Sequence, residues 1–201
     1  MLVAGLVAIF VIPSEDRDYP YNLTIVTIFK DDAPWLKEMI EYYKLIGADH
    51  MLFYDNESSD HFKDIVAPYV AEGFVEVIPF RNRPHKNKPQ AWVYETQCPA
   101  YNDAIKRLKG KSKWVAIVDT DEFIVPHKHN SLVEALKPYE GIGGVVVNWN
   151  CYGTSDVWDI PENKLMIETL TRRMSLNDSM NFYTKMIVEP EAVNRILNPH
   201  F

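Results

Sequence analysis

The sequence predicts an α/β protein with a doubly wound, mainly parallel central sheet and helices on both faces. Strand-like and helix-like segments succeed one another along the chain, which is the order expected of such a sheet. Residues 114–118 (WVAIV) are apolar at every position, as is typical of a parallel strand buried on both faces. The sequence contains no internal repeat or low-complexity tract, so one layered domain accounts for its 201 residues.

The first half of the chain alternates strand and helix signals. Short runs rich in β-branched residues predict strands, and apolar side chains at helical spacing predict the helices between them. Asp32 is the expected N-cap of the first helix, and Ser59 or Asp60 is expected to cap the second. In chain order we expect a strand at 23–29, a helix at 35–46, a strand at 50–54, a helix ending at 69, a strand at 74–79 and a helix at 92–108.

The second half opens with the apolar strand at 114–118 and becomes less regular after residue 150. Ser131 is expected to cap a short helix that ends at 139, and a glycine-rich turn leads into the next strand. In chain order we expect a strand at 145–149, a loop at 151–163, a strand at 164–171, a strand at 185–188 and a helix at about 190–197.

The two ends of the chain differ from the predicted domain at 23–201. Residues 1–13 form an apolar segment that is too short to span a bilayer as written. It fits a clipped membrane anchor, a signal segment without its basic start, or an extra packed element, and the anchor is the favoured interpretation. Residues 14–22 are polar and predict a linker. The expected location is membrane-associated or cytoplasmic.

Composition and charge exclude some classes of function. Hydrophobic residues make up 47% and charged residues 24% of the chain, as in an ordinary folded protein. The formal net charge of -7 disfavours a nonspecific binder of nucleic acid or anionic membranes. Cys98 and Cys151 lack CxxC or zinc-type spacing, which favours simple thiols over a disulfide or a metal site.

The carboxylates that follow the strand at 114–118 predict a site for a divalent metal and a diphosphate. Asp119 and Asp121 lie one residue apart at the carboxyl end of this strand, where open α/β sheets bind their ligands. Mg²⁺ and Mn²⁺ prefer a few carboxylate oxygens and share the rest of their shell with water or phosphate. A DxD triplet also suits a simple turn or a helix start, so the buried strand before it is what favours metal binding.

Other polar residues at strand ends are expected to gather at the same edge. Asp55 and Asp103 are candidate acceptors for the base and ribose of a nucleotide, and Lys30 or Lys106 is a candidate partner for its diphosphate. Residues 81–90 (RNRPHKNKPQ) form a basic loop that suits either a solvated turn or a phosphate- or acceptor-facing surface. The other carboxylates expected at this edge are Asp31, Asp32 and Asp60.

Several well-known site motifs are missing from the sequence. No GxGxxG follows the first strand, and no GxxxxGK[ST] occurs, which argues against a dinucleotide fold or a P-loop. GxSxG is also absent, and no cysteine–histidine pair has a usable context, which disfavours a hydrolase nucleophile. His127 and His129 flank a lysine after the DxD loop and are interpreted as exposed loop residues.

The ordered motifs together resemble glycosyltransferase family 92, a family with the GT-A fold. The resemblance runs from residue 23 to 201. It rests on IVTIFKDDAPW, YDNESSD and PYVAEGFVEVIPF, on Gln97 with AYNDAI, on the metal-binding motif in WVAIVDTDEF, and on NWNCYGTSD, ETLTRR, KMIVEP and a closing histidine, His200. Three departures from the family pattern are Asp31-Asp32 for Asn-Glu, Tyr152 for Phe and Asp156 for Gly. The chain looks truncated at one or both ends.

The resemblance implies a metal-dependent, inverting transferase that moves a sugar, galactose in known animal members, from a UDP-sugar to a glycan or other hydroxyl acceptor. It implies that Asp119 and Asp121 hold Mn²⁺ (or Mg²⁺) on the diphosphate and that His200 completes the metal shell. Asp55 is implied to contact the uridine, and Lys30, Asp32 and Asp103 complete the expected donor site. Inversion requires a carboxylate base, for which the candidates are Glu168, which is favoured, and Asp156.

Two other functions remain open from the sequence. A non-catalytic domain that binds a nucleotide sugar or glycan would keep the same motifs without turnover. A phosphatase that uses the first Asp of DxD as its nucleophile is less favoured, because Phe123 stands where such enzymes usually carry Thr or Val. The lysine and second acidic motif of those enzymes are not evident downstream.

Overall fold

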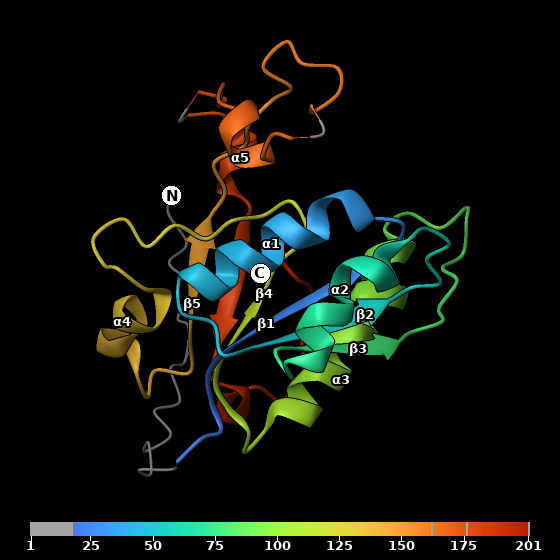
Figure 1. Cartoon of the computed structure of the whole chain (residues 1–201). Helices are drawn as coiled ribbons and strands as arrows, with labels where there is room; N and C mark the ends of the chain where they lie inside the picture. Colours follow the sequence, from blue (N-terminus) through green and yellow to red (C-terminus); the bar gives the residue numbers. More distant parts are fainter. Residues whose placement is uncertain (1–17, 162, 176, 201) are drawn as a thin grey trace, which may run out of the picture.

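A computed structural model describes residues 18–161, 163–175 and 177–200, in which one six-stranded sheet has the order β3-β2-β1-β4-β6-β5 (Figure 1). β1 to β4 run parallel to one another, and β6 is antiparallel to both of its neighbours. The expected mainly parallel α/β sheet is therefore confirmed. The predictions for residues 1–13 and 14–17 lie outside the described residues.

The elements follow one another in the expected alternation as far as β5. Their bounds are β1 Tyr21–Phe29, α1 Ala33–Leu45, β2 His50–Asp55, α2 Phe62–Ala71, β3 Val75–Pro79, η1 Trp92–Gln97, α3 Cys98–Leu108, β4 Ser112–Ile117, α4 Leu132–Leu136, η2 Lys137–Tyr139, β5 Gly144–Asn148, α5 Met166–Thr169, η3 Ser179–Phe182, β6 Thr184–Val188 and η4 Pro190–Ala192. η1 is a π-helical turn that continues directly into α3, whereas η2, η3 and η4 are short 3₁₀ turns.

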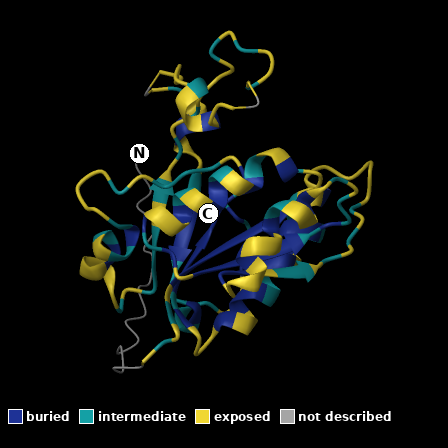
Figure 2. Ribbon diagram, viewed as in Figure 1, coloured by how far each residue is buried: buried dark blue, intermediate teal, exposed yellow. Residues whose placement is uncertain are grey.

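Helices cover both faces of the sheet, as predicted. α1 and α2 pack on one face, where Leu36 and Phe62 share a buried cluster with Trp114 of β4. α3 packs on the other face, where Tyr101 contributes to a second buried cluster with Val26 of β1. Figure 2 shows the buried strands between helices whose outer sides are exposed. Because the central strands are buried on both faces, their sequences are apolar runs rather than alternating patterns.

The parallel strands end together at one edge of the sheet. Phe29 at the end of β1 is in register with Asp55 at the end of β2, which in turn faces Pro79. Asp60 joins the two helices that begin there, because its carboxylate accepts the N–H of Ala33 at 2.8 Å and that of Phe62 at 3.2 Å. The N-cap position of α2 is His61, one residue after the predicted cap, but the Asp60 carboxylate still satisfies a free N–H group in the first turn of α2 and also one in that of α1.

Asp32 occupies the N-cap position of α1, but its side chain makes no capping hydrogen bond. Its carboxylate instead accepts the hydroxyl hydrogen of Thr120, at 3.0 Å. Ser131, in contrast, caps α4 as predicted, because its Oγ accepts the N–H of Glu134 at 3.1 Å.

The strand predicted at 164–171 is wrong, because this stretch contains the short helix α5. Glu38 of α1 accepts the N–H groups of Met166 at 2.7 Å and Ile167 at 3.0 Å, which satisfies the free donors of the first helical turn. In Figure 1 the part of the chain that carries α5 projects beyond the end of the sheet. A partner on a different element therefore helps to fix the helix.

The helix predicted at about 190–197 is also wrong, because it is reduced to the 3₁₀ turn η4. The buried backbone of Ile196 is hydrogen-bonded to the side chain of Asn102 on α3 instead of to a helical turn. Asn102 Nδ2 donates to the Ile196 carbonyl and Asn102 Oδ1 accepts the Ile196 N–H, each at 2.8 Å.

Over the described residues, none of the helices has the length and apolar character needed to cross a membrane.

Candidate functional site

The turn that follows β4 places three carboxylates at the carboxyl edge of the sheet. Val118 extends the pairing of β4 by donating its N–H to the Val26 carbonyl at 3.1 Å. The turn then closes on itself, because Glu122 Oε2 accepts the N–H of Asp119 at 2.7 Å. Tyr43 of α1 donates its hydroxyl to the Glu122 carbonyl at 2.9 Å. The orientation of the DxD turn is therefore set by the helix beneath it as well as by its own sequence.

Asp119 is paired with a buried lysine that the sequence analysis did not identify. Lys185 Nζ on β6 lies 2.7 Å from Asp119 Oδ2 and 3.0 Å from Glu122 Oε2, and its side chain is only 2% exposed. Gln97 Nε2, at the end of η1, donates to Asp119 Oδ1 at 3.3 Å. The sequence does carry a signal for this lysine, which is the charged residue of the otherwise apolar run 185–188. A charge on a buried strand needs a partner, so such a lysine indicates an ion pair.

Negative charge is crowded at this edge. Burial raises the pKa of Glu122 to about 7, with the Asp119 charge adding to the rise and the Lys185 charge opposing it. Withdrawal from water raises the pKa of Asp121, and the charge of Asp119 raises it further. Burial likewise raises the pKa of Asp32, against the opposing hydrogen bond from Thr120. A group of carboxylates with raised pKa values favours the binding of positive charge nearby.

His200 lies beside the Asp119–Lys185 pair, although it is distant in sequence. Its ring packs edge-on against Trp149 with the centroids 5.2 Å apart, and Lys185 Nζ lies 5.8 Å from the centroid of the same Trp149 ring. Burial lowers the pKa of His200, and the Lys185 charge lowers it further. Within the described part of the chain, neither His200 Nδ1 nor Trp149 Nε1 has a hydrogen-bond partner, although both atoms are buried.

A comparison with protein-family models matches residues 21–201 to glycosyltransferase family 92. The chain belongs to glycosyltransferase family 92. Similar proteins include a family 92 protein of Ricinus communis, 27% identical over 92% of this chain, one of Arabidopsis thaliana, 23% identical over 88%, and one of Oryza sativa subsp. japonica, 25% identical over 89%. The chain spans about a third of the length of these relatives, 32%, 30% and 28% respectively.

Among solved structures, the chain is similar to Staphylococcus aureus TarS (residues 1–349) in complex with UDP-GlcNAc. The TM-score is 0.49 and the sequence identity 14%, over 84% of this chain and 45% of TarS. The complex of the same TarS fragment with UDP gives a TM-score of 0.46.

Three of the residues expected to bind the donor in a family 92 site have hydrogen-bond or ion-pair partners within the chain. Asp55 Oδ1 accepts the N–H of Ser58 at 2.8 Å, which closes the turn after β2. Asp103 on α3 accepts the hydroxyl of Tyr54 at 2.8 Å and pairs with Arg107 at 2.5 Å. Lys30 is exposed at the end of β1. Asp32 is the expected donor-site residue that contacts the DxD turn directly, through Thr120.

The two base candidates of the family 92 pattern lie between β5 and β6, each paired with a nearby residue. Glu168 lies in the first turn of α5, where its Oε1 accepts the N–H of Leu165 at 3.2 Å. This hydrogen bond lowers the pKa of Glu168, and the hydrogen bond from Lys164 lowers it further. Asp156 forms an exposed ion pair with Arg172 and has a left-handed backbone, with φ of 62°. Family members are expected to carry glycine at this position, which suits a left-handed φ.

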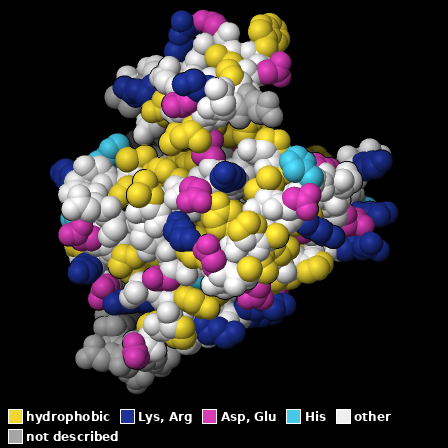
Figure 3. Space-filling view, viewed as in Figure 1, with side chains coloured by type: hydrophobic (Ala, Val, Ile, Leu, Met, Phe, Trp, Pro, Cys, Tyr) yellow, Lys and Arg dark blue, Asp and Glu magenta, His cyan; other side chains and the backbone are white. Residues whose placement is uncertain are grey.

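The basic loop at 81–90 is held by acidic residues. Arg81 and Arg83 both pair with Glu57, at 2.8 and 2.9 Å, and Lys88 pairs with Glu95 of η1 at 2.7 Å. Figure 3 shows Lys and Arg side chains along the side of the molecule where the chain leaves β3. The loop is thus fixed next to the strand edge, although its charge is partly neutralised by these partners.

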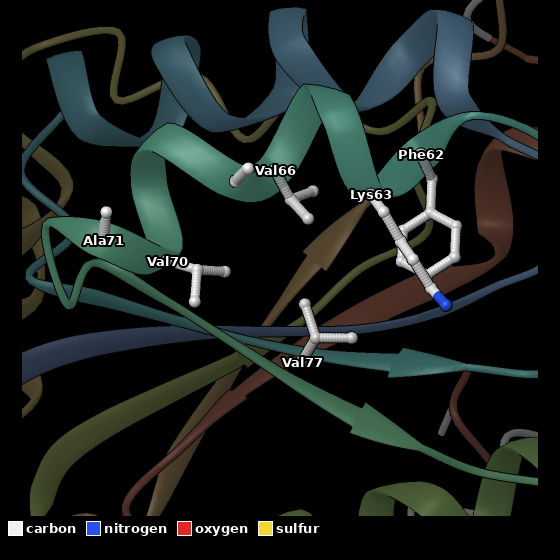
Figure 4. Close-up of a pocket in the computed structure, with 7 residues that line it drawn as sticks. Phe62, Lys63, Val66, Val70, Ala71 and Val77 are labelled. Carbon is white, nitrogen blue, oxygen red and sulfur yellow. The ribbon is translucent and has the colours of Figure 1, made fainter.

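An apolar groove of about 420 Å³ lies on a different part of the surface, between α2 and β3. Figure 4 shows Val66 and Val70 of α2 on one side of it and Val77 of β3 on the other. Lys63 is the charged residue in its lining. A groove with so few polar groups lacks the donors and acceptors that orient a nucleotide. The turn that contains Asp119, rather than this groove, is therefore the candidate functional site.

Proposed function

We propose that this chain forms the donor-binding part of a glycosyltransferase that moves a sugar from a UDP-sugar to a hydroxyl group of a glycan or similar acceptor. The observation that carries the proposal is the Asp119–Asp121 turn at the carboxyl end of β4, within a domain of family 92. Strand ends of this kind are where open α/β sheets bind ligands. The chain spans about a third of the length of its relatives, so the activity that those whole proteins would have is proposed for this chain rather than observed.

The residues at this edge fit a divalent metal that is shared with a diphosphate. Mg²⁺ and Mn²⁺ are commonly held by one or two carboxylates plus phosphate oxygens and water. Within the described ranges, no cluster of three or more His, Cys, Asp or Glu side chains forms a ready-made cage. Asp119 and Asp121 are therefore proposed as the protein ligands, and the unpaired Nδ1 of His200 is a third candidate. A metal held there would stabilise the charge that develops on the leaving UDP.

Inverting transfer also needs a base that removes the proton of the acceptor hydroxyl. Of the two candidates we propose Glu168, because family members are expected to carry glycine where Asp156 stands, so Asp156 is not part of the family pattern. Glu168 is held by the Leu165 N–H and by Lys164, and its exposed pair with Lys164 contributes little energy, so an acceptor hydroxyl can replace it. Asp55 is proposed to contact the uridine, and the donor sugar is proposed to be galactose.

A nucleotide-sugar-binding domain without turnover is the second candidate function. One observation favours it: Lys185 and Gln97 already occupy both oxygens of Asp119, and both base candidates have partners. The same contacts make Asp119 a poor nucleophile, which argues against the phosphatase alternative.

Thermal unfolding with UDP, UDP-galactose and other UDP-sugars, each with and without Mn²⁺, tests the proposal. A ligand that binds the folded state alone raises the melting temperature by mass action. We expect a Mn²⁺-dependent rise with UDP and a larger one with the true donor, both lost in an Asp119→Ala/Asp121→Ala variant. Transfer to an acceptor then separates the enzyme from the binding domain. A folded protein that no uridine nucleotide stabilises would exclude both functions.

A further inference from the structure

The ion pair between Lys185 and the DxD turn is the strongest unexplained feature of the site. Burying an ammonium group is unfavourable unless close partners compensate for it, and Lys185 has two, Asp119 at 2.7 Å and Glu122 at 3.0 Å. Replacing a buried ion pair with apolar residues often leaves stability unchanged or raises it. Stability alone therefore does not explain a buried lysine next to the apolar residues 186–188 of β6, and a role in the site does.

Lys185 occupies the oxygen that a metal at Asp119 would use. Its Nζ contacts Asp119 Oδ2, while Oδ1 is engaged by Gln97. A divalent ion bound to a carboxylate oxygen lies about 2.1 Å from it. An ammonium group at hydrogen-bond distance from that oxygen would lie within a few ångströms of the ion, where like charges repel strongly. Lys185 and a divalent metal thus compete for Asp119.

A lysine displaced from Asp119 needs another anion, and the surroundings suit a diphosphate. The lysine ammonium has three donors on a flexible stem, so it can turn to phosphate oxygens without leaving the site. Trp149 Nε1, a buried donor without a partner among the described residues, belongs to the ring over which Lys185 Nζ lies. A diphosphate would accept hydrogen bonds from both groups.

We infer that Lys185 is a resident counter-cation, which holds Asp119 and Glu122 in the free protein and turns to the diphosphate when a divalent metal takes Asp119. It follows that neither ligand binds tightly alone. The Lys185 charge repels the metal, and the carboxylates repel the diphosphate. Each ligand relieves the repulsion that the other meets, so the two bind as a pair, and this coupling is reciprocal. The inference rests on the proposed function, because it takes the ligands to be a metal and a nucleoside diphosphate.

The test compares wild type with Lys185→Met, which keeps the length of the side chain and removes its charge. Binding is measured for Mn²⁺ alone by electron paramagnetic resonance, for UDP alone in EDTA by calorimetry, and for each ligand in the presence of the other. Inorganic pyrophosphate replaces UDP in a parallel series, which isolates the diphosphate contact. Lys37→Met is the matched control, because Lys37 is an exposed lysine on α1. Lys185→Gln is used if Lys185→Met does not fold.

We expect Lys185→Met to bind Mn²⁺ alone about tenfold more tightly or better, because a neighbouring positive charge has been removed. UDP and pyrophosphate in EDTA should bind about tenfold more weakly, and the factor by which each ligand tightens the other should fall. Unchanged or weaker binding of Mn²⁺ alone in this variant overturns the inference. If wild type binds both ligands but their coupling survives in the variant, only the role of Lys185 fails. If wild type binds neither, the proposed function fails with it.

Discussion

Asn102 gives the sharpest test of how the C-terminal segment is held over the site. Its side chain donates to the Cys98 carbonyl at 2.7 Å and to the Ile196 carbonyl at 2.8 Å, and it accepts the Ile196 N–H at 2.8 Å. Asn102→Ala removes all three hydrogen bonds. It leaves the N–H and carbonyl of Ile196, a residue that is only 4% exposed, without these partners.

The expected loss in the free energy of unfolding is about 1.5–5.5 kcal/mol. Each of the two buried backbone groups of Ile196 left unpaired costs about 1–3 kcal/mol, and this penalty includes the hydrogen bond that the group loses. The higher helix propensity of alanine returns about 0.5 kcal/mol. Urea unfolding followed by tryptophan fluorescence measures the change, and hydrogen exchange at residues 193–200 shows where it acts. Asn130→Ala, at an exposed loop position, is the control and should change stability by less than about 0.5 kcal/mol.

The segment that Asn102 holds includes His200, so the variant should also bind Mn²⁺ with UDP more weakly if His200 contributes to the site. A loss of stability below about 1 kcal/mol, or unchanged hydrogen exchange at residues 193–200, would refute this reasoning. Water or new contacts would then be satisfying the Ile196 backbone.

Two further predictions concern Asp156 and Glu95. Asp156→Gly should leave stability unchanged or raise it by up to about 1 kcal/mol, because glycine suits the φ of 62° and the exposed pair with Arg172 contributes little. Thermal unfolding measures this, and sugar transfer should be kept in Asp156→Gly but lost in Glu168→Gln if Glu168 is the base. The hydrogen bond from Lys88, together with those from His85, lowers the pKa of Glu95 from 4.5 to about 2 in the folded state. Glu95 therefore stabilises the fold above pH 4.5 and loses this contribution as the pH falls toward 2, so urea unfolding should show a shallower acid loss in Glu95→Gln, and equal pH profiles would contradict it.

The parts of the fold that follow from local pattern were predictable from the sequence. The strands at 23–29, 50–54 and 114–118 and the helices between them are strongly periodic or apolar, and the structure places them within a few residues of the expected bounds. The position of the carboxylates at the end of β4 followed from the same pattern, since a buried parallel strand ends at the ligand-binding edge.

The remaining parts depend on contacts between distant residues, which no local pattern reports. α5 forms where a strand was expected because Glu38, on another helix, satisfies its first N–H groups. The residues after η4 stay irregular because Asn102 satisfies the backbone of Ile196. Lys185 was missed for the same reason, because pairing across the sheet brings it to Asp119 from 66 residues away.

The π-helical turn η1 has a consequence for how loop length is constrained. A residue in an α-helix is rotated by about 100° from the one before it, and a π turn accommodates an extra residue in the same helix. Glu95 faces the basic loop while Gln97 faces Asp119, because residues two apart on a helix point to nearly opposite sides. Deleting one residue from Trp92–Gln97 would restore the regular repeat and turn Glu95 away from Lys88 by about 100°, while α3 stayed packed. The register of this one turn, more than the composition of the loop, sets the angle at which residues 81–90 meet the edge of the sheet.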